Sequence, residues 1–213
     1  MSFLASAVIQ RARYTLLDES AVAWSNAELY SYLNGGMTQL VSIKPDAYPR
    51  VASLTLVAGT WQSLPDDGVL FLDAVQNTAG GFVTVQAAHE FVRVHPTWAA
   101  DTASANVSYV LFDPRLPTNF NVYPPATAGA TLRVKYGAMA EPVVPTTQET
   151  VDFPAWYETP LWAFVVGSAY AKNGKRQDLA KFQQFMSMFM QAVAGNTASE
   201  RSTAPAADPK GVA

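Results

Sequence analysis

The sequence predicts an α+β protein in which helices from both chain ends form one discontinuous four-helix bundle, with an inserted antiparallel β domain and an extended C-terminal tail. Apolar residues recur at helical spacing near both ends, whereas the middle of the chain alternates with a period of two. The last residues are small and polar. We therefore expect a helical bundle over 1–48 and 154–194, a β domain over 49–140, a linker over 141–153 and a tail over 195–213.

Two helices are predicted before the β domain. The first covers Phe3 to Leu17, where apolar residues lie close to helical spacing. The second begins after Ser25, whose hydroxyl can accept the amide of Glu28 in a capping box, and it ends before Pro45. Gly35-Gly36 weakens this helix by about 1 kcal/mol per glycine relative to alanine. We interpret the pair as the place where a neighbouring helix comes close.

Short strands separated by turn residues are predicted for the β domain. They begin at Val51 and continue at Trp61–Leu64, Val69–Val75, Phe82–Gln86, Val107–Phe112, Phe120–Tyr123 and Ala130–Tyr136. The alternation in the first and last of these strands predicts which side chains face inward and which face outward. The inward set is Leu54, Leu56, Leu132 and Val134, and the outward set is Ser53, Thr55, Arg133 and Lys135.

Two more helices are predicted after the β domain. One begins near Pro160 and is capped by Asn173-Gly174, and the other covers Gln177 to Ala194. The last helix has apolar residues near a/d spacing, so it should pack against other helices. These residues are Leu179, Phe182, Met186, Phe189 and Val193. From Gly195 the composition turns to Ala, Ser, Thr and Pro, which predicts a disordered tail.

Composition excludes several classes of function. The 213 residues have a net charge of −3 and no cysteine, so disulfides, thiolate metal sites and cysteine nucleophiles are absent. The basic residues are scattered along the chain, which argues against a dedicated nucleic-acid surface. The N-terminal residues lack the basic segment of a signal peptide, and no apolar run reaches the roughly 18 residues of a membrane helix. We expect a protein made and used in a cytoplasm.

No catalytic, cofactor-binding or metal-binding residue is predicted. His89 and His95 lack the spacing and the third ligand that a zinc site needs, so we interpret them as structural or surface residues. Pro65-Asp66-Asp67-Gly68 is typical of a β-turn, with proline fixing one dihedral and glycine taking a positive one. Nucleophile-elbow, Ser-x-x-Lys and Gly-rich nucleotide motifs are all missing.

The aromatic residues of the β domain allow one alternative function. They could line a sugar-binding platform, although strand aromatics more often belong to a core or to cross-strand pairs. The residues concerned are Trp61, Trp98, Tyr109, Phe112, Phe120 and Tyr123.

Three groups of residues, taken in order, resemble the portal adaptors of tailed bacteriophages, a family of head-to-tail connectors that includes the tail tubular protein A-like adaptors of short-tailed phages. The first group is Leu17-Asp18, Trp24–Leu29, Tyr32–Gly36 and Lys44–Tyr48. The second is Phe112–Arg115 followed by Phe120–Pro125, and the third is Ala169–Lys172 within the terminal helical hairpin.

The resemblance implies a structural virion protein that is not an enzyme and needs no cofactor. It implies a homo-oligomeric ring, a dodecamer, between the portal protein and the tail nozzle protein, with a channel through which DNA passes unbound. It also implies a C-terminal tail that embraces the portal, for which we name Gly195, Glu200, Arg201, Asp208 and Lys210. Two alternatives remain: another tail-completion or nozzle component, and a β-sandwich glycan-binding module on a helical stem.

Overall fold

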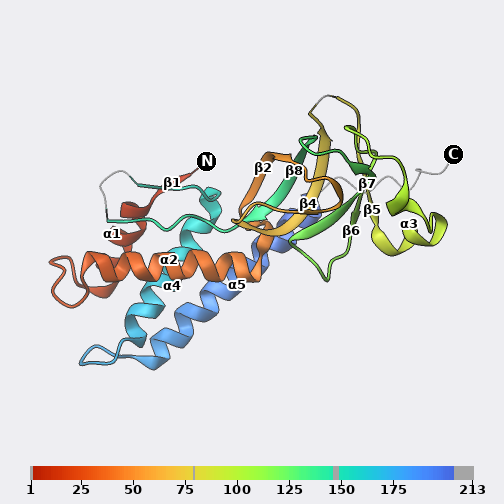
Figure 1. The fold of residues 1–213 in the computed structure, drawn as a ribbon. Helices are drawn as coiled ribbons and strands as arrows, with labels where there is room; N and C mark the ends of the chain where they lie inside the picture. The colour runs from red at the N-terminus through yellow and green to blue at the C-terminus, as the bar shows by residue number, and fades with distance from the viewer. Residues whose placement is uncertain (1, 79, 146–148, 204–213) are drawn as a thin grey trace. The chain divides into compact units, whose positions relative to one another are not determined.

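The computed structural model describes residues 2–78, 80–145 and 149–203 and confirms a mixed α+β protein (Figure 1). The chain divides into two compact units. The helical unit contains Met1–Leu40 and Pro142–Ala213, and the β unit contains Val41–Glu141. The expected boundaries of the β domain were 49 and 140, so the structural unit starts earlier, within the second helix.

Over its described residues, the helical unit is built on four helices: α1 (Ala5–Leu16), α2 (Asn26–Ile43, whose last turn belongs to the β unit), α4 (Glu158–Ala171) and α5 (Leu179–Thr203). Helix α4 packs along α5 and also contacts α1. It touches α2 as well, because a Cβ atom at Gly36 would lie only 3.0 Å from Cδ1 of Phe164. The glycine in α2 therefore marks the close approach of a helix, as its sequence predicted.

The start of the chain and the predicted linker pair with each other, which was not expected. Strand β1 (Phe3–Leu4) is antiparallel to β9 (Thr150–Val151), so the first helix begins two residues later than predicted. Val143, also in the predicted linker, is held by Asn34, whose side-chain amide bonds to its backbone N–H and C=O at 2.9 Å each. Val143, Val151 and Phe153 of the predicted linker are therefore buried in the helical unit.

Helix α5 extends past the predicted start of the tail. The expected helix ended at Ala194, whereas α5 continues through Gly195 to Thr203. One interior glycine costs a helix roughly 1 kcal/mol, so Gly195 does not by itself end α5. The expectation of an extended tail is therefore wrong for 195–203. The rest of it, 204–213, lies outside the described residues.

The β unit contains two sheets. One has the order β2-β8-β4 and the other β3-β7-β6-β5. The strands are β2 (Pro49–Thr55), β3 (Gly59–Ser63), β4 (Gly68–Asn77), β5 (Thr84–Ala87), β6 (Tyr109–Phe112), β7 (Asn119–Ala126) and β8 (Thr131–Ala138). The sheets meet at Phe71, whose ring lies 5.1 Å from that of Phe112 and 5.0 Å from that of Phe120.

The predicted register of the two alternating strands is confirmed. In β8, Leu132 and Val134 are buried while Arg133 and Lys135 are exposed. In β2, Ser53 and Thr55 are exposed, Leu54 is half-buried, and Leu56, just past the strand, is buried. These strands pair directly, with Leu54 opposite Leu132. Period-two alternation was sufficient here because one face of the sheet is covered and the other is open.

Two features of the β unit differ from the prediction. Strands β5 and β6 are parallel, whereas all the other paired strands described are antiparallel. The chain between them contains helix α3 (Ala88–Val94) and a 3-10 turn, η2 (Trp98–Ala100). A parallel pair requires such a crossover, because its strands run in the same direction.

At two glycines of the β unit, Gly68 and Gly137, there is no room for a side chain. The predicted turn forms, since the N–H of Gly68 donates to the C=O of Pro65 at 2.8 Å. Gly68 does not have the expected positive φ; instead, a Cβ there would lie 2.6 Å from Cβ of Leu64. At Gly137 in β8, a Cβ would collide with the backbone carbonyl of Pro45 in the 3-10 turn η1 (Pro45–Ala47).

Candidate interaction site

The connection between α1 and α2 folds around one buried carboxylate. Asp18 accepts hydrogen bonds from the backbone N–H groups of Val22, Ala23 and Trp24 at 3.0–3.2 Å. Burial opposes ionisation of Asp18, but these three donors and the charge of Arg13 outweigh it and hold its pKa below the ordinary value. The carboxylate is therefore the centre that organises this loop.

A buried arginine connects the same loop to both helices. Nη1 of Arg13 lies 3.5 Å from the Asp18 carboxylate and donates to the carbonyls of Asp18 and Trp24 at 3.0 and 3.1 Å. Its Nη2 donates to Oδ1 of Asn26 at 2.7 Å. A guanidinium with this many acceptors fixes the loop geometrically, because its donors form a rigid fork.

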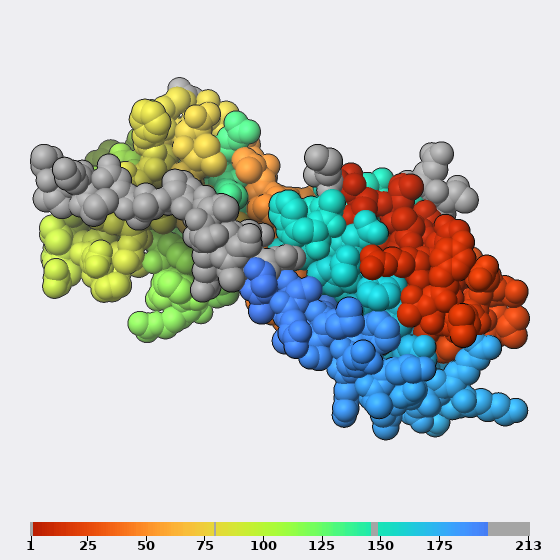
Figure 2. Space-filling view, turned by 180° about the vertical axis from the view of Figure 1, so that it is seen from behind, coloured from red at the N-terminus to blue at the C-terminus, as the bar shows by residue number. Residues whose placement is uncertain are grey.

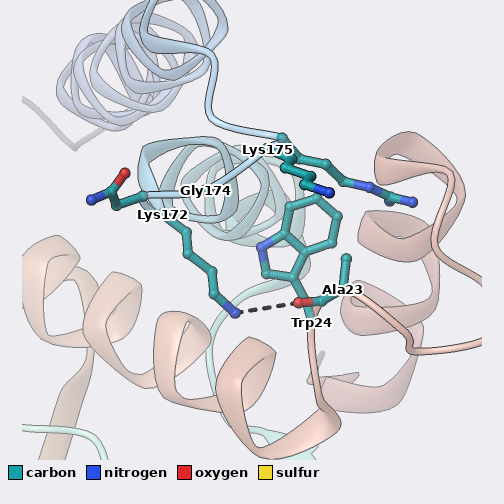
Figure 3. Close-up of a pocket in the computed structure, with 7 residues that line it drawn as sticks. Ala23, Trp24, Lys172, Gly174 and Lys175 are labelled. Atoms are coloured by element: carbon teal, nitrogen blue, oxygen red, sulfur yellow. Dashed lines mark hydrogen bonds between the residues drawn. The ribbon is translucent and has the colours of Figure 1, made fainter.

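The indole of Trp24 joins this loop to the end of α4. Its side chain is 2% exposed, and its Nε1–H donates to the carbonyl of Ala169 at 3.2 Å. Lys172, at the end of α4, donates to the carbonyl of Ala23 at 3.2 Å and to Oε2 of Glu28 at 2.8 Å. Figure 3 shows the Lys172–Ala23 bond running along one side of the indole.

Glu28, in the first turn of α2, forms hydrogen bonds with Ser25, Tyr32 and Lys172. Its backbone N–H donates to Oγ of Ser25 at 3.2 Å, which confirms that half of the predicted capping box. Its carboxylate also accepts the hydroxyl of Tyr32 at 2.8 Å. Burial favours protonation, but the bonds from Lys172 and Tyr32 outweigh it and lower the pKa of Glu28. Burial and the Glu28 carboxylate raise the pKa of Tyr32 to about 12.

Two adjoining hollows open beside this network, and we call them together the Trp24 hollow. One, of about 210 Å³, is lined by Ala23, Trp24 and the residues 172–176 of the α4–α5 connection. The other, of about 400 Å³, is lined by Leu16, Leu17, Trp24, Tyr170, Lys175, Arg176, Gln177, Asp178 and Lys181. In Figure 2 the light-blue α4–α5 connection lies next to the red residues of α1 and its following loop.

Cations surround the Trp24 hollow. The guanidinium carbon of Arg176 lies 5.4 Å from the centre of the Trp24 ring, a cation–π contact. Figure 3 shows Lys175 at the opposite side of the indole from the tip of Lys172. Our expectation of scattered basic residues missed this cluster. The signal was present, because Lys172, Lys175, Arg176 and Lys181 fall within ten residues.

The structure describes three of the five residues predicted for portal docking. Gly195, Glu200 and Arg201 all belong to helix α5. Asp208 and Lys210 lie outside the described residues.

The two histidines lie in helix α3 and at its end. His95 lies at the end of α3, with its ring 5.1 Å from that of Phe91 and 6.1 Å from that of Tyr123. His89 is exposed in the same helix. Over the described ranges, no three His, Asp or Glu side chains gather as a metal site would need. Nor does any helix in these ranges have the length and apolar character to cross a membrane.

The aromatic residues considered for a sugar platform mostly pack on one another. Tyr109 and Tyr123 lie against Phe91, with ring centres 5.3 and 4.9 Å away. Phe120 is buried between the sheets, and Trp61 is about half exposed on β3. A platform needs several exposed rings on one face, so this arrangement does not support one.

Two of the quoted groups, distant in sequence, meet around Trp24. Asp18, Trp24 and Glu28 come from the first group, and Ala169 and Lys172 come from the third. Residues from the first and third groups therefore belong to one hydrogen-bond network. A model of the SU10 adaptor protein family matches residues 4–209, nearly the whole chain. The chain belongs to this family.

Membership in the SU10 adaptor protein family confirms the resemblance to phage head-to-tail adaptors. A search of curated proteins finds no match. The family points to a structural component of a phage particle, with a role other than catalysis and with neighbours among the other head and tail proteins.

Proposed function

We propose that this protein is the head-to-tail adaptor of a tailed phage, forming a homo-oligomeric ring between the portal protein and the tail nozzle protein. The observation that carries the proposal is the family match over residues 4–209. A dodecameric ring with an open channel fits this position, since one heterologous contact repeated around an axis closes a ring. The net charge of −3 suits a channel through which DNA slides without being bound.

Within the ring, we assign the four helices of the helical unit to a bundle that faces the portal, and the β unit to the nozzle side. Residues 204–213, together with Glu200 and Arg201, are our proposed portal attachment. The segment 204–213 is composed of small residues, Pro, Asp and Lys, with a single Val as its only larger apolar residue. It can bury little surface by itself, so a partner would have to offset its conformational entropy, roughly 1–2 kcal/mol per residue.

Imaging of reconstituted complexes tests the ring. Purified protein is mixed with portal rings of the same phage, and negative-stain class averages are compared with those of the protein alone. We expect portal-dependent rings with twelve subunits. Assembly onto isolated tails instead, with no association with portal, would point to a tail-completion or nozzle component.

Two further variants test the attachment segment. One chain ends after Thr203, and the other carries Asp208→Lys with Lys210→Glu, which exchanges two charges at constant net charge. The truncated chain should fold normally and fail to attach to portal. The exchanged chain should attach more weakly if these charges fix the register. Normal attachment by the truncated chain would mean that the helices bind the portal and that residues 204–213 are not needed.

A further inference from the structure

Residues 172–181 form a basic segment in a chain whose overall net charge is negative. They contain four cations (Lys172, Lys175, Arg176, Lys181) and one carboxylate, Asp178, a net charge of 4 − 1 = +3 in a chain of −3. Lys172 is paired with Glu28 at 2.8 Å, and Lys181 with Asp178 at 3.5 Å. Among the residues that the structure describes, Lys175 and Arg176 have no carboxylate partner. The Trp24 hollow therefore offers two available cations.

Leu17 adds an apolar side chain to the edge of the same hollow. It is 84% exposed although it is a large aliphatic residue, and Val22 in the same loop is equally exposed. The backbone of Leu17 has a φ of 53°, in the left-handed region at the end of α1, where glycine or asparagine fits with less strain. Neither the backbone nor the burial of this residue explains a leucine here. A partner that covers the side chain would explain it.

The loop that presents Leu17 is held rigidly. Asp18 and Arg13 fix the backbone on its far side, and Lys172 fixes the carbonyl of Ala23. A surface held in this way loses little conformational entropy on binding, which favours affinity. The loop at the edge of the hollow is therefore preorganised for binding.

From these observations, we infer that the Trp24 hollow binds an acidic segment of a partner protein, with carboxylates on Lys175 and Arg176 and an apolar side chain on Leu17. Charge complementarity selects the carboxylates. The apolar edge favours a peptide over DNA, because phosphates would satisfy the two cations but leave Leu17 uncovered. The inference names a partner chemistry for the proposed adaptor and rests on that function for its biological setting. The binding itself can be measured without portal.

The test uses the full chain and a fluorescein-labelled synthetic peptide in which Leu and Phe alternate with Asp and Glu. Fluorescence anisotropy should show binding that weakens as salt is raised. The same peptide with Asn and Gln in place of the acids should bind about tenfold more weakly. Duplex DNA of about 20 base pairs, measured at the same ionic strength, should bind more weakly than the acidic peptide.

Matched variants identify the site. Lys175→Glu with Arg176→Glu should weaken peptide binding about tenfold or more. Lys135→Glu with Arg115→Glu makes the same charge change at exposed positions of the β unit and should leave binding unchanged. Leu17→Asn relieves the left-handed backbone, so its melting temperature should not fall, while its affinity drops about fivefold.

Three results would overturn the inference: no binding by the unchanged protein, equal binding by the Lys175→Glu, Arg176→Glu chain, or a preference for DNA. Failure of the peptide test with normal ring formation on portal would remove this site and leave the adaptor function standing. Peptide binding without ring formation on portal would support this site and contradict the proposed adaptor function.

Discussion

Nζ of Lys172 lies 2.8 Å from Oε2 of Glu28, so the end of α4 is tied to the first turn of α2 across 144 residues of sequence. Both side chains are partly exposed, which limits the strength of such a pair. A double-mutant cycle with Lys172→Met and Glu28→Gln should give a coupling energy of about 0.5–1 kcal/mol in urea unfolding. A coupling of zero would mean that the contact is incidental and that Tyr32 and Ser25 alone hold Glu28.

Asp18 should make the helical unit sensitive to acid. Its pKa is lowered in the folded state, so its contribution to stability is present above the unfolded pKa of about 3.9 and is lost as pH falls through the folded pKa. Asp18→Asn should cost about 3 kcal/mol at neutral pH, because Arg13 is left buried without its counter-charge. Urea unfolding between pH 2 and 7 should show a flatter acid limb for the variant than for the unchanged chain.

Gly35 and Gly36 should respond oppositely to the same substitution. A Cβ at Gly35 would meet Cε1 of Phe164 at an ordinary 3.7 Å, so Gly35→Ala should gain about 1 kcal/mol of helix propensity. At Gly36 the nearest atom of Phe164 would be at 3.0 Å, and overpacking costs about 1–3 kcal/mol. Gly36→Ala should therefore gain nothing or destabilise. Equal melting temperatures for the two variants would contradict the close packing of α2 on α4.

Gly35 and Gly36 are an example of a structural feature that could be predicted from the sequence. Helix propensity and capping predicted α2 and the approach of a neighbour, and period-two alternation predicted which face of β8 is buried. These signals are local, so one chain is enough to read them. The parallel pairing of β5 with β6 and the pairing of Phe3 with Val151 depend on distant residues, for which periodicity gives no partner.

The Trp24 hollow could be predicted only in part. The capping box at Ser25 and the four basic residues within 172–181 are visible in the sequence. Their meeting is not, because it depends on Asp18 collecting three backbone N–H groups and on Trp24 reaching Ala169. The end of α5 was missed for another reason. Glycine weakens a helix by only about 1 kcal/mol, which is too little to end a helix by itself.

Gly137 should tolerate no side chain. A Cβ there would collide with the backbone carbonyl of Pro45, and a backbone atom cannot move aside as a flexible side chain can. Adjacent Ala138 also donates its N–H to the carbonyl of Tyr48 at 2.9 Å, which fixes η1 against β8. Gly137→Ala should cost about 3 kcal/mol or more, measured by urea unfolding. Gly35→Ala is the matched control, being the same change at a position with room.

Phe189 should contribute more to stability than Phe182, although both belong to the predicted apolar seam of α5. Phe189 is 1% exposed and lies edge-to-face with Phe164 of α4 at 5.2 Å, whereas Phe182 is half-buried and Leu179 is mostly exposed. The seam therefore begins later along the helix than its spacing predicted. Phe189→Ala should cost about 3–5 kcal/mol, the range for a fully buried phenylalanine, and Phe182→Ala clearly less. Urea unfolding of the two variants, with Gln183→Ala as an exposed control on the same helix, measures the difference. A larger loss for Phe182→Ala would mean that the α4–α5 contact near the hairpin turn contributes more to stability than the contact at Phe189.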